Sequence, residues 1–376
     1  MKIVLTGGGS GGHFYPLIAV AQEINEIVRA QKLVGIKLFY LADEPYDPQA
    51  LFENHIEFRH VSAGKMRRYF AVLNLFDLFK TFIGVFSALW YTYWIYPDVV
   101  FGKGGYASFP MLWAARFFKI PVIIHESDAH PGRVNLWAAR FASRIAISFT
   151  EAAKYFPKEK TAITGHPIRK DVAHPLTLGA HQFLKLEKGI PVIFVTGGSQ
   201  GAMAINETVL DILPQLVEHY QVIHQAGKNN IKDVEKRATV ILGDNPFRER
   251  YRLFPFLSET ALRMTAGITE LVISRAGAGT IFELATWGTP AIVIPLPESV
   301  SHDQRHNAFD YARGGGAIVI EQANLTPSVL LSEINRLLNN RALLTEMREG
   351  AKRFAKPDAA KLIAEEIIKL ALEHEK

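Results

Sequence analysis

Two glycine-rich turns are the segments of this chain best suited to chemistry. The first is Gly7-Gly8-Gly9-Ser10-Gly11-Gly12-His13 and the second is Gly197-Gly198-Ser199-Gln200-Gly201. Each follows an apolar run and predicts a buried strand that turns into a helix. Backbone N–H groups at the start of such a helix point at an anion. We therefore expect two similar α/β halves that face one another, with a phosphorylated ligand between them.

A third segment, residues 274–283, has the sequence Ser-Arg-Ala-Gly-Ala-Gly-Thr-Ile-Phe-Glu. It predicts a strand end, a turn of small residues and a helix whose first N–H groups, around residues 278–280, hold a diphosphate. Glu283 then lies early in that helix, where its carboxylate can accept hydrogen bonds from both hydroxyls of a ribose. A polar cluster at residues 302–308 follows the next predicted strand and belongs to the same crevice.

The first glycine turn also fits a dinucleotide-binding pattern, because Gly7, Gly9 and Gly12 have the spacing Gly-x-Gly-x-x-Gly. In that pattern an acidic residue follows about twenty residues later, at the end of the second strand. Asp43 lies about thirty residues after Gly12, and His13 directly follows the last glycine. The spacing favours another phosphate or sugar ligand, with a nicotinamide site as the alternative.

The positions of apolar runs predict alternating strands and helices, which is typical of doubly wound parallel sheets. The first half has predicted strands at residues 2–6, 36–41, 56–61, 98–102, 120–125, 143–148 and 160–164. The second half has them at residues 191–196, 220–225, 238–242, 270–274, 290–295 and 316–320. Turn formers from Gly165 onward indicate a hinge. We expect an N-terminal domain at 1–168, a C-terminal domain at 169–356 and an amphipathic closing helix within 357–376.

Composition limits the class of protein. The 376 residues include no cysteine, which excludes disulfides, thiolate metal sites and cysteine nucleophiles and suits a reducing cytosol. Met1 and Lys2 lead directly into a strand pattern, so we expect no secretory signal.

The net charge of +5 arises within residues 1–168, where 18 Lys and Arg face 13 Asp and Glu. This half therefore suits an anionic membrane or acceptor, although chance scatter of charge is an alternative.

Residues 81–97 form an uncharged, aromatic stretch. Its 17 residues are at the short limit for a membrane span, and a strand pattern follows at once. We interpret it as a domain helix that touches lipid headgroups, with a plain core helix and a true span as alternatives. The supporting aromatic residues are Trp90, Tyr91, Tyr93, Trp94 and Tyr96, and the preceding basic residues are Lys65, Arg67 and Arg68.

The ordered motifs of the chain resemble the MurG family of glycosyltransferases over nearly its whole length. They are the first glycine turn with His13, Gly102-Lys103-Gly104-Gly105-Tyr106, His125-Glu126, Gly165-His166-Pro167-Ile168-Arg169, the second glycine turn, Arg-x-Gly-Ala-x-Thr-x-x-Glu and Asp-Gln-x-x-Asn-Ala. The resemblance implies an α/β GT-B fold, in which two Rossmann-like domains with doubly wound parallel sheets face a central cleft. The closing helix is then expected to pack back on the N-terminal domain.

The implied activity is inverting transfer of N-acetylglucosamine from UDP-N-acetylglucosamine to the C4 hydroxyl of the muramoyl sugar of undecaprenyl-pyrophosphoryl-muramoyl-pentapeptide. The N-terminal domain would take the lipid acceptor and meet an anionic membrane, and the C-terminal domain would bind the UDP-sugar. The resemblance implies a peripheral place on the cytoplasmic face of the bacterial cell membrane. It implies no cofactor, no metal and no nucleic acid. A related GT-B transferase for another hexose and lipid, and a GT-B UDP-sugar epimerase, are the alternatives.

The resemblance also carries over the residues that bind substrate. These are Ser10, Gly11, Gly12, Gly104, Gly105, Tyr106, Asn135, Arg169, Ser199, Gln200, Gly201, Leu257, Ala278, Gly279, Thr280, Ile281, Phe282, Glu283, Asp303 and Gln304. Among them Ser199 matches a diphosphate contact, Leu257 the residue whose backbone reads uracil, and Gln304 the glutamine that holds the sugar hydroxyls.

Two departures from the family pattern replace an amide with a carboxylate that only accepts hydrogen bonds. The family usually has His-Glu-Gln-Asn where this chain has His125-Glu126-Ser127-Asp128, and Asp303 stands where many members have glutamine. The Asp128 carboxylate therefore replaces an asparagine expected to contact the donor.

Displacing UDP from an anomeric carbon builds negative charge on the diphosphate and requires the acceptor hydroxyl to lose a proton. The pattern Asp-x-Asp, which holds a metal in another glycosyltransferase fold, is absent from the sequence. A helix dipole and N–H groups would then stabilise the leaving group. His13 is the first candidate for the catalytic base because imidazole titrates near neutrality, and it can instead bind a sugar hydroxyl. Glu126 and Asp128 are its catalytic rivals.

Overall fold

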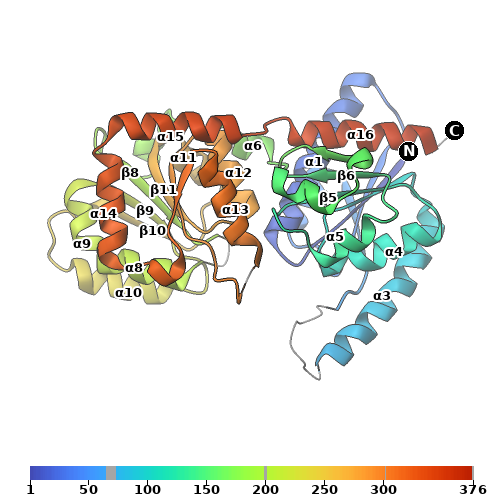
Figure 1. The fold of residues 1–376 in the computed structure, drawn as a ribbon, viewed down its shortest axis with the longest axis horizontal. Helices are drawn as coiled ribbons and strands as arrows, with labels where there is room; N and C mark the ends of the chain where they lie inside the picture. The colour runs from blue at the N-terminus through green and yellow to red at the C-terminus, as the bar shows by residue number, and fades with distance from the viewer. Residues whose placement is uncertain (65–72, 199–200, 301, 375–376) are drawn as a thin grey trace. The chain divides into compact units, whose positions relative to one another are not determined.

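A computed structural model describes residues 1–64, 73–198, 201–300 and 302–374 of the chain. The chain divides into two compact units, the first comprising Met1–Arg169 with Lys356–Lys376 and the second Lys170–Ala355. Each unit is a parallel sheet with helices on both of its faces (Figure 1). The expected doubly wound α/β class is confirmed.

The sheet of the first unit has seven parallel strands among the described residues, in the order β3-β2-β1-β4-β5-β6-β7. They are β1 (Lys2–Thr6), β2 (Lys37–Ala42), β3 (Ile56–His60), β4 (Val99–Gly102), β5 (Val122–Glu126), β6 (Arg144–Ile147) and β7 (Thr161–Ile163). Thr6 is in register with Leu41 and Gly102, so the loops after β1, β2 and β4 begin at one level. The strand order reverses between β1 and β4, which is where ligands bind to such sheets.

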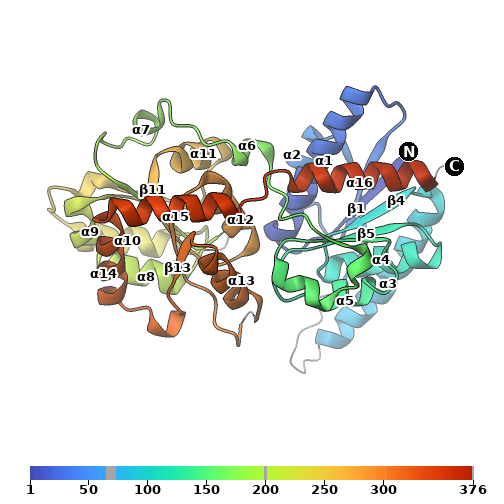
Figure 2. The same cartoon turned by 45° about the horizontal axis from the view of Figure 1, so that its top comes forward.

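Helices cover both faces of this first sheet. They are α1 (Gly11–Gln31), α2 (Pro48–Glu53), α3 (Leu73–Ile95), α4 (Phe109–Phe117), α5 (Arg133–Ala138) and α16 (Ala359–His374). Apolar residues of α1, such as Leu17 and Ile24, share a buried core with Ile363 and Ile367 of α16. Figure 2 shows α16 lying across this sheet, and α16 contacts both α1 and β4.

The closing helix was predicted within residues 357–376, and α16 lies there at Ala359–His374. Its apolar residues were expected to share one buried face, but Leu362 is 48% exposed. Ala360, Ala364 and Ile368 are buried as well. The buried face is therefore rotated toward these three residues.

The second unit contains a six-stranded parallel sheet within its described part, in the order β10-β9-β8-β11-β12-β13. The strands are β8 (Val192–Thr196), β9 (Gln221–Gln225), β10 (Tyr251–Phe254), β11 (Thr269–Ser274), β12 (Ala291–Val293) and β13 (Ala317–Val319). Its helices are α6 (Lys170–Ala173), α7 (Ala180–Phe183), α8 (Met203–Asp211), α9 (Leu213–His219), α10 (Ile231–Leu242), α11 (Glu259–Ile268), α12 (Ala278–Trp287), α13 (His302–Arg313), α14 (Pro327–Leu338) and α15 (Arg341–Phe354). The order reverses between β8 and β11, as it does in the first unit.

One predicted strand of this unit, residues 238–242, is wrong. These residues end α10, whose buried positions Val234, Ala238 and Leu242 recur every four residues. Helical burial therefore overrides the strand preference of their β-branched side chains. The edge strand is instead β10, which the sequence analysis missed because arginine interrupts its short apolar run.

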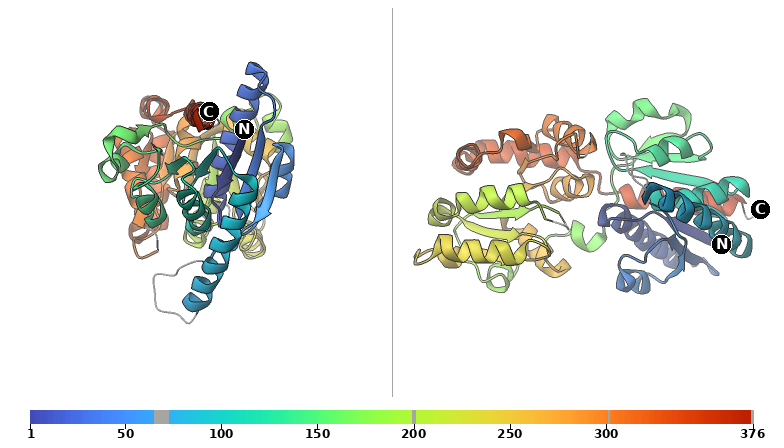
Figure 3. Two further views of the ribbon diagram at one scale, coloured as in Figure 1. Left: turned by 90° about the vertical axis from the view of Figure 1, so that its right-hand side faces the viewer. Right: turned by 90° about the horizontal axis from the view of Figure 1, so that it is seen from below.

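The aromatic stretch predicted as a domain helix belongs to α3, which projects beyond the first sheet (Figure 3). One side of α3 packs on the unit through Ala88 and Thr92, which are 0% and 1% exposed. Large apolar residues on its other side are 47–64% exposed, namely Leu78, Phe79, Phe82, Ile83, Phe86, Trp90, Tyr93 and Trp94. Within the described ranges, none of the helices has the length and apolar character needed to cross a membrane.

Candidate functional site

The first glycine turn brings His13 to the carboxyl edge of the first sheet. Ser10 precedes α1 in an extended conformation, and its hydroxyl oxygen lies 2.9 Å from Nδ1 of His13. The other ring nitrogen, Nε2, faces the loop after β4, since a Cβ added to Gly105 would lie 3.4 Å from it. The imidazole is therefore held between the loops that follow two adjacent strands.

Burial lowers the pKa of His13 to about 4, and the charge of Lys103 acts in the same direction. The ring is accordingly neutral at pH 7 and carries a lone pair on one nitrogen. If Nδ1–H donates to the Ser10 hydroxyl, Nε2 is the nitrogen that can accept a proton.

Glycines allow the loops of this edge to pack closely. Gly104 and Gly105 have φ angles of +81° and +76°, in the region where other residues are strained. A Cβ on Gly104 would lie 2.7 Å from Nδ2 of Asn135, and one on Gly9 would lie 2.8 Å from the Tyr106 ring. The structure thus brings together predicted residues from the loop after β1, the loop after β4 and helix α5.

Glu126 lies at the end of β5 and is 4% exposed. Its Oε1 accepts a hydrogen bond from the Asp128 N–H at 3.0 Å. Its Oε2 accepts from the Gly132 N–H at 3.1 Å and from Nδ2 of Asn135 at 2.9 Å. Burial raises the pKa of this carboxyl group, although these hydrogen bonds oppose the rise. Glu126 therefore shapes the loop after β5, and a role as catalytic base stays a prediction for Glu126 and for Asp128.

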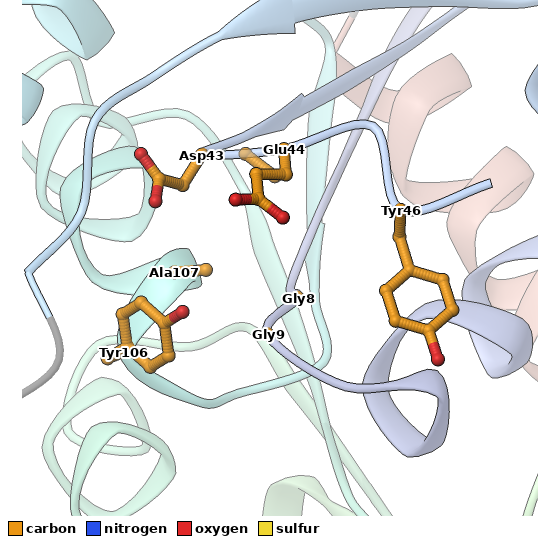
Figure 4. A pocket seen from close by; sticks show the side chains of 8 residues that line it. Gly8, Gly9, Asp43, Glu44, Tyr46, Tyr106 and Ala107 are labelled. Carbon is orange, nitrogen blue, oxygen red and sulfur yellow. The ribbon is translucent and has the colours of Figure 1, made fainter. Parts of the chain in front are cut away.

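A small pocket of about 150 Å³ opens on the β2 side of the first glycine turn (Figure 4). Gly8 and Gly9 line it together with Tyr106 and with the carboxylates of Asp43 and Glu44. These carboxylates disfavour an anion on this side of the turn. On the β4 side the buried Lys103 lies against Gly7 of the turn instead. The sequence analysis considered Asp43 only as the acidic residue of a dinucleotide-binding pattern and missed the acidic pocket.

In the second unit, the predicted diphosphate segment is the start of α12. Gly277 precedes the helix without a side-chain cap, and the Ile281 N–H closes the first turn on its carbonyl at 3.0 Å. Ala278, Gly279 and Thr280 are thus the first three residues of the helix, whose N–H groups find no acceptor within the helix itself. Ile281 and Phe282 are buried, and Glu283 is half-buried on the second turn.

Two side chains fix the turn that leads into α12. Nη1 of Arg275 donates to the Ile294 carbonyl at 3.1 Å, and Nδ2 of Asn307 donates to the Ala276 carbonyl at 3.4 Å. In α13, Oε1 of Gln304 accepts from the Leu296 N–H at 3.2 Å. The backbone of Asp303 belongs to the same helix, and its side chain lies outside the described residues.

The second glycine turn is only partly described, because Ser199 and Gln200 lie outside the described residues. Gly201 has a φ of +77°, and a Cβ there would collide with the Ala226 carbonyl oxygen. Lys65, Arg67 and Arg68 also lie outside the described residues.

Leu257 is 2% exposed, and its N–H donates to Oε1 of Gln225 at 2.9 Å. Nε2 of Gln225 donates in turn to the Thr196 hydroxyl at 3.1 Å. Gln225, which the sequence analysis did not single out, thus ties the loop of Leu257 to the end of β8. Gln225 could have been identified from the sequence, because it is a polar residue at the end of a predicted strand.

The predicted residues whose positions the structure describes therefore gather at two sheet edges, one in each unit. Arg169 differs from these residues because its guanidinium contacts an aromatic ring. It ends the N-terminal segment of the first unit, and its guanidinium lies 4.3 Å from the centre of the Tyr15 ring. That geometry is a cation–π contact with α1. Across the described ranges, no group of three His, Asp or Glu side chains is arranged to hold a metal ion.

Comparisons with known proteins agree with this two-unit organisation. The N-terminal domain of glycosyltransferase family 28 matches residues 3–147, and the C-terminal domain of that family matches residues 192–363. A similar protein from Bacillus thuringiensis subsp. konkukian (strain 97-27) is 37% identical over 93% of this chain and 95% of its own length. It is named UDP-N-acetylglucosamine–N-acetylmuramyl-(pentapeptide) pyrophosphoryl-undecaprenol N-acetylglucosamine transferase 2. A protein of Clostridium perfringens (strain 13 / Type A), with the same name except for the number, is 36% identical over 90% of this chain and 91% of its own.

Solved structures share the fold. The crystal structure of MurG from Acinetobacter baumannii matches with a TM-score of 0.72 and 29% identity, over 98% of this chain and 99% of that one. UDP-GlcNAc 2-epimerase from Neisseria meningitidis, bound to UDP-GlcNAc, matches with a TM-score of 0.68 and 16% identity, over 98% and 100% of the two chains. At 16% identity, the similarity to the epimerase shows only that the two proteins share a fold.

Proposed function

The chain belongs to the MurG family within glycosyltransferase family 28, and from this membership we infer that it transfers N-acetylglucosamine from UDP-N-acetylglucosamine to a lipid-linked acceptor. The acceptor is undecaprenyl-pyrophosphoryl-muramoyl-pentapeptide, and the sugar is added to the C4 hydroxyl of its muramoyl group. This reaction converts lipid I to lipid II in peptidoglycan synthesis. The observation that carries the inference is 37% identity to a transferase of that name over 93% of this chain.

The second unit is proposed to bind the donor. The first N–H groups of α12 stabilise the diphosphate as negative charge builds on it, and Glu283 accepts hydrogen bonds from the ribose hydroxyls. Leu257 reads uracil through its backbone, which requires its N–H to exchange Gln225 for the base. Gln304 holds the hydroxyls of the sugar.

The first unit is proposed to bind the acceptor and take its proton. Nε2 of His13 accepts the proton of the C4 hydroxyl while Nδ1–H donates to Ser10. The hydroxyl oxygen attacks the anomeric carbon as the bond to UDP breaks, so an α-linked donor gives a β-linked product in one displacement. The low pKa of His13 leaves the ring unprotonated at pH 7, as a proton acceptor must be, and also makes it a weaker base than a histidine in water.

The different-class alternative, a UDP-sugar epimerase, shares the fold and the donor. It needs no acceptor. Incubating the protein with UDP-N-acetylglucosamine alone distinguishes the two, since the proposed transferase leaves the sugar configuration unchanged. Formation of the 2-epimer without acceptor would favour the epimerase.

We also propose that the protein lies peripherally on the cytoplasmic face of the bacterial membrane, with α3 against anionic lipid. The exposed residues Phe82, Phe86, Trp90 and Trp94 recur every four residues along one side of α3. Aromatic rings in such a stripe are suited to the boundary between headgroups and acyl chains. The three basic residues at 65, 67 and 68 precede this helix in the sequence and would meet anionic headgroups.

Replacing Trp90 and Trp94 with serine is expected to lower the affinity for vesicles of anionic phospholipid by at least about tenfold. Both indoles are exposed, at 62% and 64%, so the change removes apolar contact with lipid without opening the core. Sedimentation with vesicles measures the effect, and calorimetric binding of UDP should be unchanged. Phe183→Ser is a matched control, since this exposed aromatic residue lies in the second unit. Equal sedimentation of the double variant and the wild type would remove α3 from the membrane proposal.

A further inference from the structure

Lys103 is a buried cation beside the first glycine turn that the proposed mechanism does not use. It follows β4 directly and is 1% exposed. Its stem is covered by the loop after β1, because a Cβ on Gly7 would lie 2.8 Å from Cβ of Lys103. A lysine is almost never buried this deeply unless its ammonium group is paired.

The partners of this ammonium group come from β5 and the loop that follows it. Nζ of Lys103 lies 2.7 Å from Nδ1 of His125 and also contacts the Ser127 hydroxyl. Nε2 of His125 lies 3.0 Å from the Gly165 carbonyl oxygen, which can only accept. The proton of the neutral ring is therefore on Nε2, and the lone pair on Nδ1 accepts from Lys103. This arrangement links the end of β4 to the segment after β7 through one imidazole.

Two carboxylates act on the same ammonium group. Burial lowers the pKa of Lys103 to about 8, while the charges of Glu126 and Asp128 oppose the fall. The group is therefore mostly charged at pH 7. Its charge in turn lowers the pKa of His13 on α1, of His125 on β5 and of His166 after β7. These five residues are the titratable groups whose charges couple to Lys103 from the elements around it.

We propose that Lys103 is a positioning residue for the proposed transfer reaction, a role that rests on that function. Its ammonium group orients the His125 ring and the turn at Ser127. Its positive charge interacts favourably with the carboxylates of Glu126 and Asp128 near the edge where His13 lies. On this account the half-buried Asp128, which departs from the family pattern, is an electrostatic partner of the buried Lys103.

A double-mutant cycle of Lys103→Met and Asp128→Asn tests this proposal. Lys103→Met is expected to lower kcat by about 10²-fold, because the loop after β5 loses its anchor and reacting groups shift. The acid limb of the kcat profile should move to higher pH, since His13 and Glu126 then hold protons more tightly. Adding Asp128→Asn removes the unbalanced carboxylate and should recover about tenfold in kcat. Calorimetric binding of UDP reports folding of the second unit and should be unchanged throughout.

Asp128→Asn alone provides a test that does not require Lys103→Met to fold. Losing the Asp128 charge lowers the pKa of Lys103, so the alkaline limb of the kcat profile near pH 8 should move to lower pH. Lys158→Met is the matched control, because Lys158 is exposed in the same unit and should leave kcat unchanged. A Lys103→Met variant with wild-type kcat, or a cycle without recovery, would overturn the proposal, as would an unmoved alkaline limb in Asp128→Asn.

Nitrogen-15 NMR of the histidine rings separates this proposal from the transfer function. It should show His125 neutral with the proton on Nε2 at pH 7, and its Nδ1 signal should move in Lys103→Met. This result is independent of whether the wild type transfers sugar. An unchanged Nδ1 signal would contradict the role of Lys103 even in an active enzyme, whereas a changed signal in an inactive wild type would contradict only the transfer function.

Discussion

Replacing His13 with alanine is expected to lower kcat by about 10² to 10⁴, the usual size of a lost general base. The imidazole is neutral at pH 7, since burial and Lys103 hold its pKa at about 4. Its Nε2 lies beside Gly105, and its Nδ1 is anchored on Ser10. The wild type should therefore keep its activity down to about pH 4 and lose it as His13 becomes protonated. Steady-state rates across pH, at saturating donor and acceptor, measure both effects.

A thermal unfolding curve like that of the wild type distinguishes the loss of a base from a general loss of structure in His13→Ala, and UDP binding reports on the second unit. UDP should bind this variant as it binds the wild type, because the residues proposed to hold its uracil, ribose and diphosphate belong to the second unit. His219→Ala is a control of the same type, since His219 is exposed on α9 and should leave kcat unchanged. A His13→Ala variant that raises the acceptor KM with kcat intact would instead assign His13 to a sugar hydroxyl.

Replacing Glu283 with alanine is expected to weaken donor binding by about 1.5 to 3 kcal/mol, because the ribose hydroxyls lose a charged acceptor. That loss corresponds to a rise of about 10- to 150-fold in the dissociation constant of UDP. Glu283 is half-buried on the second turn of α12, directly after the proposed diphosphate segment. Calorimetric titration with UDP measures the change.

Two controls make the Glu283 result specific. Glu235→Ala changes an exposed glutamate on α10 of the same unit and should leave UDP affinity unchanged. Titration with 2′-deoxy-UDP should show a smaller difference between Glu283→Ala and the wild type, because one of the two hydroxyls is gone. Unaltered UDP affinity in Glu283→Ala would remove this residue from the ribose site.

The glycine turns allowed the fold to be predicted because each marks a place where a buried strand ends and the chain turns toward a helix. Apolar runs directly before Gly7, Gly197 and Ser274 marked β1, β8 and β11, the strands next to each reversal of strand order. The C-terminal helix followed from apolar residues at helical spacing. Strand β10 escaped prediction because residues 238–242 carry a stronger strand preference and yet complete the buried side of α10.

The electrostatics of the site could not be predicted from local sequence. Lys103 was noted only as part of a motif, and its burial depends on contacts with residues of β5 and the loop after β1. The acidic pocket likewise requires the loop after β2 to lie beside the loop after β1. Glu126 was predicted as a catalytic rival of His13, but its hydrogen bonds to residues 128, 132 and 135 became visible only in three dimensions.

The central claim is tested most directly by transfer of labelled sugar from UDP-N-acetylglucosamine to purified undecaprenyl-pyrophosphoryl-muramoyl-pentapeptide. The account predicts a lipid-linked disaccharide with a β linkage to the C4 hydroxyl, identified by mass spectrometry and NMR. UDP-glucose and UDP-galactose, offered under the same conditions, should give much less product. Efficient transfer from either of them, or no transfer to this acceptor beside an active family member as positive control, would contradict the assigned function.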